Sequence, residues 1–185
     1  TIALGLFGVD TSFLSLFPYL PVIFFAATVP TPMRAAAITL WVVLFPDNVG
    51  QMAAFGFVQH NFFVLFNALL GLLFLRYAEG QFAAVEKTLA PKPGSRLKPG
   101  SDDYKAQGVI YLSPEARFSH LLSLPEDADV GRALNNAMKD IERDNAELED
   151  VLPKNFNEIP KDTLIELIRL LQPLEIDGDA FGHVY

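Results

Sequence analysis

The chain has 185 residues, of which 51% are hydrophobic and 19% are charged, and its formal net charge is −8. An acidic chain without a basic run is a poor candidate for binding nucleic acid through its own charge, because phosphate contacts need clustered Lys and Arg. The sequence contains no cysteine, which excludes disulfides, thiolate chemistry and cysteine-ligated zinc. Because it begins with Thr rather than Met, we expect the chain to be a fragment of a longer protein.

Charged residues are rare in the first part of the chain. Residues 1–75 contain one basic and two acidic residues, against 13 basic and 20 acidic residues in 76–185. Three apolar runs occupy this first part, at 12–29, 35–45 and 62–75. The second and third runs are shorter than the roughly 20 residues of a membrane helix, and they predict buried core helices.

The run at 12–29 allows two interpretations. Its length reaches the lower limit of a membrane span, but Pro18 and Pro21 disfavour a regular helix there, since proline removes a backbone hydrogen bond. We therefore predict a hydrophobic extension over residues 1–61 that is either inserted in a membrane or the product of a misplaced gene start. With Arg34 as its one basic residue, the extension gives no membrane orientation.

Residues 62–90 predict one helix that changes character along its length. Between residues 62 and 77 apolar side chains cover every face, which is typical of a helix buried in a protein core or in lipid. Beyond residue 77 the pattern becomes amphipathic, as expected of a core helix that emerges at the surface. The Pro- and Gly-rich stretch from 90 to 103 predicts a loop.

The next segments predict a short extended stretch and a helix start. Residues 104–112 fit one strand or an extended segment. Ser113 and Pro114 then predict the beginning of a helix, because a serine oxygen can cap the first amides and proline is pre-set for the first helical position.

Two amphipathic helices are predicted further along, at 127–145 and 160–172, each with its apolar residues on one face. The segment 151–156 between them predicts a loop with apolar anchors, and residues 177–179 can cap a last helix. No apolar–polar alternation is long enough for a sheet. The predicted fold class is mainly α, a multi-helix domain preceded by an atypical apolar extension.

Motifs for catalysis or metal binding are nearly absent. His60, His120 and His183 lie far apart, and none belongs to a metal-binding motif. The acidic pair at 177–179 lacks the spaced carboxylates of a calcium loop. The sequence also contains no phosphate-binding glycine loop, nucleophile elbow or dinucleotide-binding fingerprint. We therefore predict no catalytic, cofactor-binding or metal-binding residue in this chain.

Several segments, in order, carry a resemblance to a known family: LLGLLFLRY at 69–77, YKAQGVIYLSPEARFSHL at 104–121, NNAMKDIERDN at 135–145, VLPKNF at 151–156, LIELIRLLQPL at 164–174 and DAFGHVY at 179–185. They resemble the N-terminal helical domain of the modification (methyltransferase) subunit of type I restriction–modification systems. The resemblance covers residues 62–185. It does not extend to residues 1–45, which are apolar and proline-rich where the family has a short polar helix.

The resemblance implies a function for the complete protein. Such a subunit would transfer a methyl group from S-adenosylmethionine to the exocyclic amine of adenine at a specific DNA site, after flipping the base out of the duplex. The implied partners are DNA, the specificity subunit, the restriction subunit and a second copy of the modification subunit, in the cytoplasm of a bacterial or archaeal cell. The family's cofactor and catalytic segments lie downstream, so no catalytic residue is carried over.

The same resemblance gives the helical domain a role in embracing DNA and in contacting the catalytic domain and the specificity subunit. Direct phosphate contact would need basic residues on one face, and the candidates are Arg117, Lys154 and Lys161. The net charge of −7 over 76–185 fits protein docking better.

Two other classes of function stay open. The nearly uncharged stretch 12–75 also fits a small membrane-anchored protein with a cytosolic helical interaction domain. The chain could also be an isolated helical interaction module, which would have the same fold but no part in methyl transfer.

Overall fold

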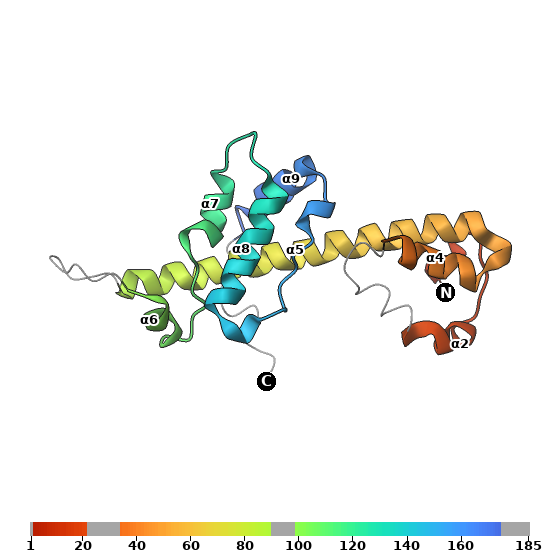
Figure 1. The fold of residues 1–185 in the computed structure, drawn as a ribbon, viewed down its shortest axis with the longest axis horizontal. Coiled ribbons are helices and arrows are strands. Elements are labelled where there is room, and N and C mark those ends of the chain that lie inside the picture. The colour runs from red at the N-terminus through yellow and green to blue at the C-terminus, as the bar shows by residue number, and fades with distance from the viewer. Residues whose placement is uncertain (1, 22–33, 90–98, 175–185) are drawn as a thin grey trace. The chain divides into compact units, whose positions relative to one another are not determined.

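A computed structural model describes residues 2–21, 34–89 and 99–174 of the chain, and within these ranges every regular element is a helix (Figure 1). The elements, with η for short 3-10 helices, are α1 Ile2–Gly5, α2 Phe13–Leu16, η1 Phe17–Tyr19, α4 Arg34–Leu44, η2 Pro46–Asn48, α5 Val49–Leu89, α6 Ser101–Lys105, η3 Pro114–Ala116, α7 Phe118–Leu122, α8 Val130–Asp144, η4 Ala146–Leu148, η5 Phe156–Glu158 and α9 Lys161–Leu171. The predicted mainly α fold is confirmed.

The chain divides into two compact units, an N-terminal unit at Thr1–Phe66 and a C-terminal unit at Asn67–Tyr185. The prediction had placed the domain boundary at residues 61 and 62. Helix α5 is shared between the units, so its first part belongs to one and its second part to the other.

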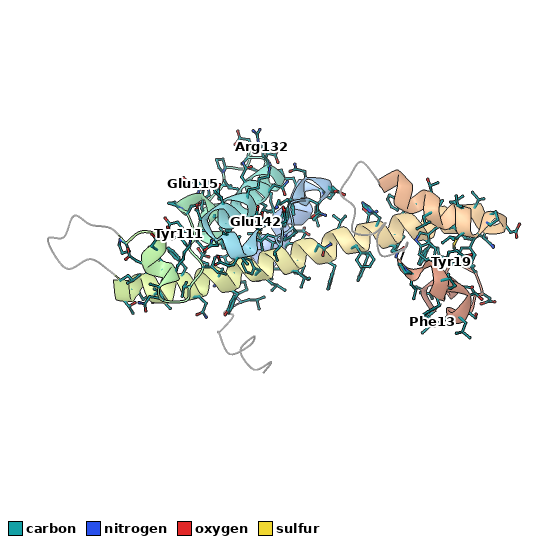
Figure 2. All side chains as sticks on the ribbon, turned by 60° about the horizontal axis from the view of Figure 1, so that its bottom comes forward. Phe13, Tyr19, Tyr111, Glu115, Arg132 and Glu142 are labelled. Atoms are coloured by element: carbon teal, nitrogen blue, oxygen red, sulfur yellow. The ribbon has the colours of Figure 1, made fainter. Side chains whose placement is uncertain are left out.

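The N-terminal unit has a small aromatic core of its own. Trp41 of α4 meets Phe55 of α5 edge to face, with ring centroids 4.8 Å apart. Helix α4 can approach α5 closely because residue 56 is glycine: a Cβ there would lie 3.1 Å from the Cα of Ile38. Phe13 and Tyr19, labelled in Figure 2, are exposed. The described part of the run at 12–29 is split between α2 and η1, and its remainder from residue 22 lies outside the described residues.

The C-terminal unit is built around the second part of α5. Helices α7, α8 and α9 lie on one side of it in both views (Figures 1 and 2). The residues of α5 that face this side are fully or almost fully buried and recur at steps of three and four: Ala68, Leu72, Leu75, Ala78 and Phe82. Helix α8 contacts α7, α9, η3 and η5, so it is the second centre of the core.

The apolar stretch of α5 differs from the prediction in two ways. The helix predicted at 62–90 is part of a 41-residue helix that begins at Val49, because uncharged, helix-compatible sequence extends back to that residue. It is also covered on one side only: Leu72 is fully buried, whereas Leu70 is 48% exposed and Phe66 is 45% exposed. The described helices of the C-terminal unit pack on one side of α5 (Figures 1 and 2).

One stretch in the described ranges, Pro46–Leu89, is long and apolar enough to cross a membrane, judged by length and composition alone. In its most apolar window 28% of the residues are buried. A core helix of a soluble protein passes the same test, so the stretch does not decide between lipid and protein surroundings.

The stretch 104–112, predicted as one strand or an extended segment, contains no strand in the structure. Helix α6 begins earlier, at Ser101, where the Asp103 carboxylate accepts the amide hydrogen of Gly100 at 2.7 Å. A turn with Gly108 at a φ of +70° follows, and residues 109–113 have no regular secondary structure. The backbone amide and carbonyl of Tyr111 both pair with the side chain of Asn145.

The helix predicted from Ser113 forms as two pieces. Pro114 opens η3 as expected, but the Ser113 hydroxyl makes no capping hydrogen bond, and it is buried without a hydrogen-bond partner among the described residues. Arg117 adopts an extended conformation that separates η3 from α7. The amphipathic helices at 127–145 and 160–172 are confirmed as α8 and α9, and the predicted cap at 177–179 lies outside the described residues.

Candidate functional site

Arg117, the first predicted DNA contact, is held against α5. Its Nη2 lies 3.3 Å from the Oε1 of Glu86, and its guanidinium carbon lies 4.7 Å from the ring centroid of Phe82. The ion pair and the cation–π contact both favour one orientation of the side chain. A phosphate would have to compete with the Glu86 carboxylate for this cation.

Glu79, one helical turn before Phe82, fixes the start of α7. Its Oε1 accepts the backbone amide of Ser119 at 3.0 Å and the hydroxyl of the same residue at 2.7 Å. Arg76 lies 3.9 Å from the other carboxylate oxygen and over the ring of Phe118. Because the first amides of a helix lack intrahelical partners, a carboxylate from α5 joins α7 to it.

These residues line an open groove of about 380 Å³ between α5 and α7. Two arginines and two glutamates lie along it, so their formal charges cancel. The Nε atoms of Arg76 and Arg117 are buried there without a hydrogen-bond partner in the described part of the chain. We call this the Arg76–Arg117 groove.

Lys154, the second predicted DNA contact, lies between two carboxylates. Its Nζ is 2.5 Å from the Oε2 of Glu142 and 3.1 Å from the Oδ1 of Asp150. The hydrogen bond to Glu142 raises the pKa of Lys154 above its ordinary value, opposed by desolvation and assisted by the bond to Asp150. Two neighbouring negative charges outweigh the one positive charge, which disfavours a phosphate at this position.

Lys161, the third candidate, begins α9 and donates a hydrogen bond from its ammonium group to the backbone carbonyl of Glu126. The three candidates therefore each have an acceptor within the C-terminal unit. DNA contact by Arg117, Lys154 and Lys161 stays a prediction.

Sequence reasoning missed the polar side chains that hold the loops of this unit. Asn145 is fully buried; its Oδ1 accepts the amide of Tyr111, and its Nδ2 donates to the carbonyls of Tyr111 and Ile141. Asn135 accepts the amide of Phe156 at 3.1 Å. Glu142, labelled in Figure 2 with Tyr111, accepts the amide of Leu152 at 3.0 Å. The sequence signal that could have identified these residues is their position among the apolar residues of the segment NNAMKDIERDN.

Two glycines allow the loop at 151–156 to approach the helices. A Cβ on Gly71 would lie 2.5 Å from the Cγ of Pro153 and 3.2 Å from the ring of Phe156. A Cβ on Gly131 of α8 would lie 3.1 Å from the carbonyl oxygen of Phe156. The segments LLGLLFLRY and VLPKNF, far apart in sequence, thus meet at Gly71.

Tyr104 of α6 contributes an aromatic stack at the end of α5. Its ring lies parallel to that of Phe82, with centroids 4.4 Å apart. Burial is the main cause that raises the pKa of Tyr104, and the charge of Glu86 adds to it.

Within the described ranges, no three or more His, Asp and Glu side chains gather into a group that could hold a metal ion. His60 and His120 belong to different units, and His183 lies outside the described residues. The side chains that the fold brings together hold helices and loops in place.

A second open groove, of about 590 Å³, lies between the end of α7 and the side of α9. Its floor is apolar and includes Leu121, Val130 and Ile168, which are buried. Its rim carries acidic side chains, described further below.

The comparisons with known proteins agree with this arrangement. The family described as the HsdM N-terminal domain matches residues 65–171, which include the second part of α5 and every element through α9. Neither the curated proteins nor the solved structures gave a match. Because the family covers more than half of the chain, this protein belongs to the HsdM N-terminal domain family, the N-terminal domain of the modification subunit of type I restriction–modification systems.

Proposed function

We propose that this chain is the N-terminal part of a modification subunit that methylates adenine at a specific DNA sequence, with S-adenosylmethionine as the methyl donor. In this proposal the helical domain assembles the methyltransferase on DNA together with the specificity subunit, a second modification subunit and the restriction subunit. The complex would work in the cytoplasm of a bacterial or archaeal cell.

The observation that carries the proposal is the family match over residues 65–171. The packing supports an assembly role in particular. The segments that resemble the family hold one another through Gly71, Asn135, Glu142 and Asn145. A unit whose distinctive residues fix its own loops is suited to presenting a stable surface to other subunits.

S-adenosylmethionine does not fit the grooves described above. Its adenine ring needs an enclosed slot, whereas both grooves are open, and one is lined by ion pairs while the other is rimmed by carboxylates. In this proposal the described residues carry no step of methyl transfer, and cofactor binding belongs to the rest of the subunit.

The experiment is methylation by the reconstituted complex. The reading frame that contains this chain is co-expressed with the neighbouring specificity-subunit gene, and the purified complex is incubated with DNA and labelled S-adenosylmethionine. We expect labelled N6-methyladenine in the nucleosides after digestion. Label on cytosine would contradict the adenine assignment, and equal labelling without the specificity subunit would contradict the assembly role.

DNA contact by the three candidate cations is tested in the same complex. Arg117→Gln, Lys154→Gln and Lys161→Gln are compared with Lys139→Gln, which replaces an exposed lysine on α8. Each phosphate contact that is lost should reduce the dependence of DNA affinity on salt by about one unit of log–log slope. If a variant has the same log–log slope as Lys139→Gln, the residue that it replaces makes no phosphate contact.

A second candidate function, a membrane-anchored protein with a cytosolic helical interaction domain, rests on the composition of α5. No Asp, Glu, Lys or Arg occurs between Val49 and Leu75, and Pro46–Leu89 is long enough to span a bilayer. Sedimentation with membranes that resists an alkaline carbonate wash would favour this function. Recovery of the whole chain in the soluble fraction without detergent would exclude it.

A further inference from the structure

The groove between α7 and α9 combines an apolar floor with an acidic rim. Besides its three buried residues, the floor contains the half-buried side chains of Leu122, Leu124 and Ile165. We call it the α7–α9 groove. A volume of about 590 Å³ is in the range of sites that bind several side chains or a small ligand.

The rim carries three acidic side chains and one basic side chain. Glu126 lies on the loop before α8, and Asp162 and Glu166 lie on α9 one turn apart; all three are exposed. Arg169 is the basic residue of the rim. The hydrogen bond from Lys161 to the carbonyl of Glu126 joins the loop to α9, so the two walls of the groove are held together by the fold.

This charge distribution selects among occupants. Excess negative charge on the rim repels the phosphates of DNA and anionic lipid head groups. The apolar floor disfavours a purely ionic ligand, since it offers little to a hydrated cation. A helix with apolar residues on one face and Lys or Arg beside them satisfies both parts of the groove, with anchors spaced three, four and seven residues apart.

We propose that the α7–α9 groove docks a basic amphipathic helix of a partner protein. The identity of that partner rests on the proposed function, which makes it the specificity subunit. The apolar face of the helix lies on Leu122, Ile165 and their neighbours, and its cations pair with Glu126 and Glu166. This surface lies beside the Arg76–Arg117 groove and shares Leu122 with it, but the charged residues that line the two grooves are different.

The test uses the complete modification subunit and two double variants with the same change in net charge. Glu126→Lys with Glu166→Lys reverses the rim of the groove. Glu147→Lys with Glu149→Lys reverses two exposed acids in and beside η4, outside the groove. Thermal unfolding of each variant establishes that the fold is kept, and exposed positions make a large loss of stability unexpected.

The first measurement is the dissociation constant for the purified specificity subunit by isothermal titration calorimetry. We expect the groove variant to bind at least about tenfold more weakly at low salt, with a smaller difference at high salt, because rim charges act through screened attraction. We expect the control variant to stay within about threefold of the wild type. Equal weakening in both variants, or none in either, would overturn the proposal.

A second measurement separates the groove from the identity of its partner. A synthetic 14-residue amphipathic helix of Leu and Lys is titrated into the wild type and both variants, followed by fluorescence anisotropy. If the wild type binds the peptide through the groove but never binds the specificity subunit, the groove stands and the proposed function fails. If all three proteins bind the peptide equally, the groove is wrong whatever the specificity subunit does.

Discussion

Leu72 offers the sharpest test of how α5 is used in the C-terminal unit. Its side chain is 0% exposed, whereas Leu70, two residues earlier on the same helix, is 48% exposed. The two leucines have the same chemistry and helix propensity, so replacing each in turn isolates the effect of burial. The pair therefore distinguishes a helix with one covered side from a helix that lies wholly in lipid.

The expected magnitude follows from burial. Leu→Ala at a fully buried position costs about 2–5 kcal/mol, and the same change at an exposed position costs about 0.5 kcal/mol or less. Against a typical total stability of about 5–15 kcal/mol, Leu72→Ala weakens the unit severely. Leu72→Asp should unfold it, because a buried charge without a partner adds a larger penalty.

The assay is hydrogen exchange followed by mass spectrometry, read on peptides from α8, together with thermal unfolding. A loss of 2–5 kcal/mol speeds exchange in α8 by about 30-fold to several thousand-fold, at about 1.4 kcal/mol for each factor of ten. Leu70→Ala and Leu70→Asp should leave exchange in α8 nearly unchanged. Equal effects at the two positions, or no effect of Leu72→Asp, would refute the assignment of Leu72 to the core.

Three further outcomes are expected. Asn145→Ala should lower the free energy of unfolding by about 2–4 kcal/mol, because it leaves buried backbone groups unpaired, while Asn136→Ala on the exposed side of α8 should cost much less in the same urea titration. Gly71→Val should lower the melting temperature by several degrees, since its Cβ would collide with the loop at 151–156; an unchanged melting temperature would show that the loop does not cross α5 there. The raised pKa values of Lys154 and Tyr104 mean that the folded state holds both protons more tightly than the unfolded state. Their contributions to stability are therefore present below about pH 10 and are lost as the pH rises through the folded pKa values. Melting temperatures measured from pH 9 to 11.5 should fall less steeply for Lys154→Met than for the wild type, and parallel curves would contradict the role of this lysine.

The sequence determined the helices whose amphipathic pattern is long and uninterrupted. For α8 and α9, the spacing of apolar residues alone predicts which side faces inward, and Leu134, Met138 and Leu164 are indeed fully buried. The continuous apolar pattern of α5 likewise predicts a helix, because local spacing and helix propensity act within one segment.

Tertiary structure decided whatever depends on residues distant in sequence. Residues 104–112 fit a strand or an extended segment by composition, but the backbone of Tyr111 pairs with the side chain of Asn145, 34 residues further along the chain. Ser113 is a residue type that caps helices, yet its hydroxyl is buried and has no hydrogen-bond partner in the part of the chain that the structure describes. A sequence pattern reports local preference, and these outcomes depend on which groups the fold brings near.

The candidate cations illustrate the same limit. Arg117, Lys154 and Lys161 carry positive charge in any sequence analysis, but Glu86 lies 31 residues from Arg117 and Glu142 lies 12 residues from Lys154. Only folding shows that these charges already have acceptors. Likewise, the sequence makes α5 apolar on every face between residues 62 and 77, but among the described residues Leu72 is covered and Leu70 is not, because a helix buries only the side against which other elements pack.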